Sequence, residues 1–89
     1  MQQAEKQATD IRQQAQTLAD KVKKEGYQQA DSLTGKAGNN PLLQAAAKPA
    51  ADQLRKQSDD RAADIIREAQ NRADSVVAAA QRQAEQLSR

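Results

Sequence analysis

Large apolar residues recur every eleven residues in the second half of the chain, and this spacing restricts the possible folds more than any other feature. Alanine or serine fills the intervening steps of four, four and three residues, so the stripe stays on one side of a helix. Eleven residues in three turns is about 3.67 per turn, which suits a nearly straight or slightly right-handed helix pair. The large residues are Leu43, Leu54, Ile65, Val76 and Leu87.

The same spacing predicts an all-α fold, an antiparallel hairpin of two long helices in a single module. Gly35 is expected to adopt the left-handed conformation that ends the first helix. Asn40 followed by Pro41 is typical of a cap residue and a first-turn proline. Pro49 occupies a solvent-facing position of the second pattern, so we expect a bend there rather than a break. The predicted segments are a first helix over 1–34, a hairpin loop over 35–40 and a second helix over 41–89.

Folding back at this loop places the two stripes face to face, and matching their phases predicts the helix–helix interface. Large residues then meet large ones: Leu33 with Leu43, Val22 with Leu54, and Ile11 with Ile65. Small residues meet small ones: Ala30 with Ala47, Gly26 with Ala51, Ala19 with Ser58, Ala15 with Ala62, Ala8 with Ala69, and Ala4 with Ala73. So many small residues predict closely spaced helix axes.

The second helix is longer than the first, so this pairing leaves its end without a partner. At about 1.5 Å per residue, the predicted lengths are roughly 50 Å and 73 Å. We therefore expect the overhang to contact a second copy of the chain, or sequence upstream in a longer protein. A homodimer that forms a four-helix bundle is the simplest arrangement. The expected contact residues are Ile66, Val76, Val77, Ala80, Ala84 and Leu87.

Composition argues against catalysis and against several ligand classes. The 89 residues contain no histidine and no cysteine, which removes common general bases, nucleophiles and metal ligands. Asp60, Asp64 and Glu68 share a helical side, but interleaved arginines favour a charged outer face over a metal site. The 14 basic and 12 acidic residues are interspersed, so we expect no nucleic-acid partner. No cofactor, catalytic residue, metal site or transmembrane segment is predicted.

Two segments carry a resemblance to known repeat proteins. The sequences "AEKQATDIRQQAQTLADKV" and "ADIIREAQNRADSVVAAAQRQAEQL" resemble the alanine-rich eleven-residue repeats of peripheral-stalk subunits from rotary ATPases. They also look like the repeats of desiccation-related and apolipoprotein-type helical proteins. The run "NPLLQAAAKPAADQLRKQSDDRAADII" looks like parts of uncharacterised bacterial envelope-associated proteins, which implies an envelope or periplasmic location.

These features predict a structural or interaction module, a helical spacer or self-association platform within a larger bacterial protein. Two alternatives remain open. Eleven-residue repeats also allow a helix to lie on a lipid surface, although this stripe is narrow and lacks aromatic anchors. A clamp that grips client proteins would need an exposed apolar patch, which only the region of Ile66 and Val77 offers.

Overall fold

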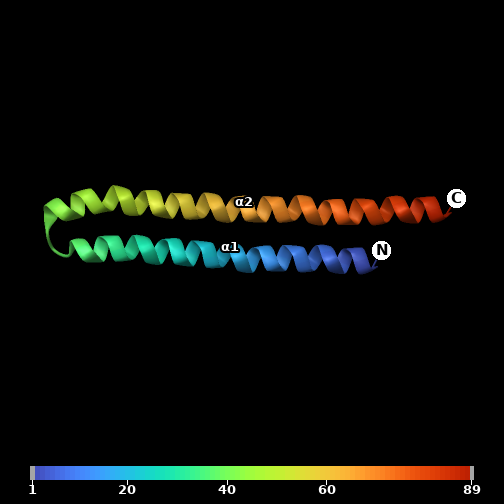
Figure 1. The fold of residues 1–89 in the computed structure, drawn as a ribbon, viewed down its shortest axis with the longest axis horizontal. Helices are drawn as coiled ribbons and strands as arrows, with labels where there is room; N and C mark the ends of the chain where they lie inside the picture. Colours follow the sequence, from blue (N-terminus) through green and yellow to red (C-terminus); the bar gives the residue numbers. More distant parts are fainter. Residues whose placement is uncertain (1, 89) are drawn as a thin grey trace.

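The computed structural model describes residues 2–88 as two long antiparallel helices, α1 (Gln2–Ala37) and α2 (Pro41–Ser88), packed side by side along their length (Figure 1). The all-α helical hairpin predicted from the stripe is confirmed. The molecule is elongated, with principal extents of 73 × 15 × 7 Å. Its radius of gyration is 20.4 Å, whereas a compact domain of this length has about 12 Å.

The turn between the helices lies three residues later than predicted. Gly35 is helical, and α1 continues to Ala37, so the prediction that α1 ends at Gly35 is wrong. Gly38 has the left-handed backbone, with φ at 56°, and its N–H donates to the Gly35 carbonyl at 3.1 Å. Glycine adopts this conformation without a Cβ penalty, and both glycines are available to the chain. The first helix therefore continues past Gly35 and ends at Ala37, directly before Gly38.

The start of α2 agrees with the predicted cap. The Asn40 side-chain oxygen accepts hydrogen bonds from the backbone N–H groups of Leu42 at 3.0 Å and Leu43 at 3.3 Å. Pro41 follows as the first helical residue, where its missing N–H is not required. Further along, Pro49 lies inside α2 with its ring exposed, and the helix continues through it.

The pairing between the helices differs from the predicted one by seven residues, about two helical turns. Gly26 lies against Ser58 rather than Ala51: a Cβ built on Gly26 would stand 1.6 Å from the Ser58 Oγ. The cross-helix hydrogen bond from Tyr27 to Asp59 is one residue along from this pair on each helix. The predicted phase of the stripes holds, but the predicted partners along them are wrong.

The observed pairing places large residues against small ones. Counting outward from Gly26 and Ser58, one residue along α1 for each residue back along α2, gives the opposing pairs. Side chains of unequal size interdigitate better than two large or two small layers. The large-with-small pairs are Ala8 with Val76, Ile11 with Ala73, Ala19 with Ile65, Val22 with Ala62, Ala30 with Leu54, and Leu33 with Ala51.

Alanine burial follows this pairing. The six alanines that face a valine, leucine or isoleucine are all 0–1 % exposed. Ala15 and Ala69, which face each other, are each 8 % exposed because a short partner leaves a gap. The fully buried set is Ala8, Ala19, Ala30, Ala51, Ala62 and Ala73. Each is shielded by a larger side chain from the other helix.

The shifted pairing also changes both ends of the hairpin. Val76 and Ala80 were expected to lie beyond α1, but they oppose Ala8 and Ala4 and are half-buried, so this part of the overhang prediction is wrong. At the other end, the first turn of α2 projects past the end of α1 (Figure 1). Leu43 is 51 % exposed there, so its predicted pairing with Leu33 is also wrong.

Candidate functional site

The seam between α1 and α2 is the main feature that could carry function, and its core consists almost entirely of alanine. Among residues 2–88, no large side chain is fully buried. The helices approach closely where Gly26 meets Ser58, and the Ser58 hydroxyl donates to the Leu54 carbonyl at 2.8 Å within its own helix. The seam is therefore a thin, tightly packed line with little apolar area to stabilise a monomer.

One long side of the seam carries polar bonds between the helices, and we call it the bonded flank. It is formed by the residue that follows each interface position, on both helices. In an antiparallel pair, these residues project to the same side of the seam because each residue turns the helix by about 100°. The bonded flank contains Arg12, Tyr27 and Asp31 from α1, and Arg55, Asp59, Gln70 and Asp74 from α2.

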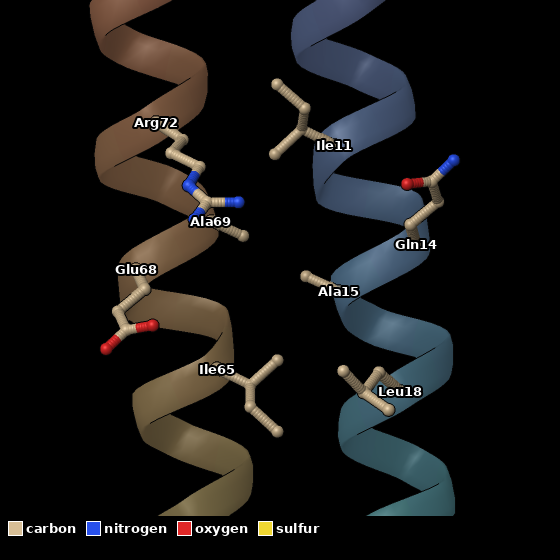
Figure 2. A pocket seen from close by; sticks show the side chains of 8 residues that line it. All are labelled: Ile11, Gln14, Ala15, Leu18, Ile65, Glu68, Ala69 and Arg72. Carbon is tan, nitrogen blue, oxygen red and sulfur yellow. The ribbon is translucent and has the colours of Figure 1, made fainter.

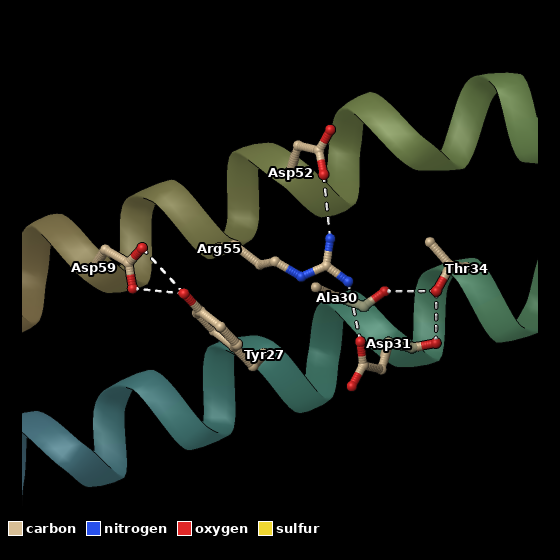
Figure 3. A network of polar contacts seen from close by, with 7 residues as sticks. All are labelled: Tyr27, Ala30, Asp31, Thr34, Asp52, Arg55 and Asp59. Atoms are coloured by element: carbon tan, nitrogen blue, oxygen red, sulfur yellow. Dashed lines mark hydrogen bonds and ion pairs between the residues drawn. The ribbon is translucent and has the colours of Figure 1, made fainter.

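Figure 3 shows the denser part of this flank, where Arg55 reaches from α2 to α1. Its guanidinium donates to Asp31 of α1 at 3.0 Å and to Asp52 of its own helix at 3.1 Å. The Arg55 side chain is 32 % exposed, while its partners are exposed by more than half. Exposed ion pairs contribute little energy, so this network adds little to the stability of the hairpin, although it forms only in this alignment of the helices.

A second polar contact lies nearer the free ends of the helices. Arg12 of α1 donates to Gln70 at 3.1 Å and to Asp74 at 3.3 Å, and the Gln70 amide donates to Asp74 at 3.2 Å. These bonds form in the same alignment of the two helices that places Gly26 against Ser58. Polar groups at separate points of the bonded flank thus select one alignment of two repetitive stripes.

Within residues 2–88, Tyr27 is the titratable group whose pKa departs clearly from its ordinary value. Its hydroxyl donates to both carboxylate oxygens of Asp59, at 2.9 and 3.1 Å (Figure 3). This hydrogen bond raises the pKa of Tyr27 above 10.0, partial desolvation and the Asp59 charge add to the rise, and Arg55 opposes it. Ionisation of Tyr27 would break the bond and place two negative charges together.

We predict that Asp59→Asn lowers the pKa of Tyr27. Tyr27 is the only tyrosine in the chain, so the absorbance of tyrosinate in an alkaline titration reports this residue alone. Because the folded pKa is raised, the bond stabilises the fold below pH 10 and is lost as pH rises through the folded pKa. Asp64→Asn is the matched control, since Asp64 pairs with Arg67 and does not contact Tyr27. Equal titration curves for both variants would contradict the assignment.

The other long side of the seam, the open flank, is formed by the residue that precedes each interface position. Five shallow grooves run along it. Figure 2 shows the groove in the middle of the hairpin, where Ala15 and Ala69 point toward each other between the helices. Leu18, Glu68 and Arg72 line its sides, and Leu18 is 50 % exposed. The two flanks therefore differ in chemistry.

Most residues predicted for the interface lie in the seam. The buried ones are Ala4, Ala8, Ala15, Ala19, Gly26, Ala30, Ala51, Ser58, Ala62, Ala69 and Ala73. The half-buried ones are Ile11, Val22, Leu33, Ala47, Leu54 and Ile65. Among the residues predicted to contact a second copy, Val76, Val77 and Ala80 are half-buried, while Ile66, Ala84 and Leu87 are exposed.

Several contributors to the seam were not predicted from the sequence. Ala37 is buried, and it continues the stripe, but it was assigned to the loop because α1 was expected to end earlier. Leu18 precedes the stripe by one residue and so was left out. The bonded flank was also missed, because Tyr27 and Asp59 can be matched only when Gly26 is known to face Ser58.

Residues 2–88 contain no group of three or more acidic side chains placed to hold a metal ion. Asp64, considered in the sequence as a possible ligand, forms an ion pair with Arg67 at 2.6 Å. Neither α1 nor α2 includes a stretch apolar and long enough to span a bilayer.

Comparison with known proteins identifies no relative of this chain. A scan against protein-family models, a search of curated proteins and a search of solved structures each returned no significant match.

Proposed function

We propose that this chain is a non-enzymatic structural module, a rigid helical-hairpin spacer that self-associates. The observation that carries the proposal is the combination of an elongated shape, 73 Å long, with a seam that buries no large side chain among residues 2–88. A hairpin of this shape can hold two attached parts of a protein apart, and its long sides are available for contact with another molecule. Its composition, without histidine or cysteine, favours this role over a catalytic one.

The energetic argument for self-association follows from the alanine core. Ordering a residue costs about 1–2 kcal/mol of backbone entropy, and an alanine methyl returns only about 0.8 kcal/mol when it is buried. Long helices in isolation are marginal, and most of their stability in proteins comes from packing an apolar face. A second copy would bury additional leucine and isoleucine side chains, such as Leu18, which is half exposed in the hairpin.

We expect a helical species with twice the 9.7 kDa chain mass, or a larger multiple, in light scattering after gel filtration. Circular dichroism on the same peak should show high helicity in buffer alone. A helical monomer at micromolar concentration would contradict self-association, but the proposed role as a rigid spacer would stand.

An unfolded monomer that becomes helical only with anionic vesicles would favour the lipid-surface alternative instead. That alternative requires the stripe to face lipid, whereas the hairpin encloses it between α1 and α2. Vesicles of neutral lipid are the control, because a response to anionic vesicles alone would indicate electrostatic attraction of the helix to the lipid surface.

A further inference from the structure

The hairpin exposes more surface than a compact protein of its mass. Its accessible surface is 6943 Å², whereas the scaling for folded monomers gives about 5,100 Å² at 9.7 kDa. The excess is about 1,800 Å², and a standard interface needs only about 800 Å² from each partner. One long flank can therefore be covered by another molecule while the opposite flank stays in water.

The two flanks are not equivalent candidates for this contact. On the bonded flank, the side chains of Arg12, Tyr27 and Arg55 are already committed to partners on the opposite helix. On the open flank, Leu18 presents half of its surface, and the neighbouring groove has an apolar floor that includes Ile11 and Ile65. Burial of this groove would remove apolar area from water without breaking a cross-helix bond.

We infer that a second copy of this chain docks on the open flank, in an antiparallel arrangement centred on the groove beside Leu18. This inference rests on the proposed self-association and specifies its surface. Glu68 and Arg72 line the groove four residues apart, so they project from the same face of α2. Within residues 2–88, neither side chain takes part in an ion pair.

A two-fold axis that passes between Glu68 and Arg72 explains why the occupant is a second copy. The axis sets each Glu68 beside Arg72 of the other copy, so the ion pair forms twice in the dimer. By the pairing of the helices, the same axis crosses α1 at Gln14, another residue of the groove. Two glutamine amides can pair with each other because each carries both a donor and an acceptor. At these two positions the open flank is complementary to itself.

The first test compares Leu18→Glu with Ile66→Glu by sedimentation equilibrium of the full chain. The two side chains are matched, since Leu18 is 50 % exposed on the open flank and Ile66 is 39 % exposed on the bonded flank. We expect Leu18→Glu to raise the dimer dissociation constant about tenfold or more, because the axis sets residue 18 opposite Asp10 of the other copy, where a second carboxylate would meet a like charge. Ile66→Glu should leave it within about threefold, as expected for a residue outside the interface core.

The second test uses charge reversal at the same groove. Glu68→Arg should weaken the dimer about tenfold, because Arg72 of the other copy would then meet a like charge. The double variant Glu68→Arg with Arg72→Glu should return to within about threefold of the original affinity, since it restores opposite charges across the axis. Circular dichroism on each variant separates loss of association from loss of helix.

The outcomes distinguish this inference from the proposed function. A dimer weakened by Ile66→Glu but not by Leu18→Glu would overturn the open flank as the contact and keep self-association. Failure of the double charge reversal to restore affinity would overturn the antiparallel arrangement. A wild-type chain that stays monomeric at high concentration would refute self-association itself and the inference with it.

Discussion

Gly26→Ala is expected to destabilise the hairpin, and the identical substitution at Gly35 is expected to stabilise it. A Cβ at Gly26 would lie 1.6 Å from the Oγ and 2.5 Å from the Cβ of Ser58, so the helices must move apart. Overpacking of this kind costs about 1–3 kcal/mol. The better helix propensity of alanine offsets about 1 kcal/mol of that loss, which leaves a net decrease of about 1 kcal/mol.

Gly35 provides the matched control on the same helix. No atom lies within 4 Å of a Cβ built there, and its backbone is helical. Gly35→Ala should therefore raise the free energy of unfolding by about 1 kcal/mol through reduced entropy of the unfolded chain. Urea denaturation at one fixed protein concentration should show a difference of about 2 kcal/mol between the variants. Equal effects would contradict the close approach at Gly26.

Ser58→Gly should rescue Gly26→Ala. The double variant moves the small residue from α1 to α2 and removes the Ser58 side chain, the source of the two closest contacts. The crossing then pairs alanine with glycine in place of glycine with serine, so the axis separation can be kept. A double variant no more stable than Gly26→Ala alone would indicate that the clash involves other atoms.

The second large effect concerns the pairing of Leu54 with Ala30. Leu54→Ala is expected to lower the free energy of unfolding by about 2 kcal/mol, because the half-buried leucine shields the fully buried Ala30. Ala30→Leu is expected to cost a similar amount, about 1–3 kcal/mol, because a second leucine would meet Leu54 in a filled layer. Exchange of the two residues restores one large and one small side chain.

The exchange therefore tests the alignment of the helices directly. Ala30→Leu with Leu54→Ala should be at least 1 kcal/mol more stable than the sum of the single effects predicts, roughly the coupling seen between residues in contact. Ala30→Leu with Ile65→Ala is the control, because Ile65 faces Ala19, and its effects should add. If Leu54 faced Val22, as the matched stripes predicted, neither double variant would show coupling.

Much of this structure was predictable because helical periodicity is a local property. The eleven-residue stripe identified the two helices, their antiparallel hairpin and the residues that enter the seam, including Ala19, Gly26 and Ala62. The cap at Asn40 was also predictable, since the side chain bonds to backbone groups only two and three residues away. These features depend on neighbours along the chain.

The partners across the seam were not predictable, because a repeating stripe fits its opposite at several positions. A shift of seven residues keeps every predicted interface residue except Leu43 in the seam and changes which residues oppose each other. The sequence alone favoured large against large, while the folded hairpin sets large against small. The end of α1 was equally open, since either Gly35 or Gly38 could have ended the helix.

By itself, the sequence determined two helices, one stripe on each and a turn within residues 35–40, because these follow from local spacing and capping. Only the tertiary structure decided that Gly26 meets Ser58 and that Tyr27 bonds Asp59. It also decided that one flank is bonded while the other stays open. The physical reason is that packing and cross-helix hydrogen bonds act between residues far apart in the chain, and they select one alignment among several that share the same stripe.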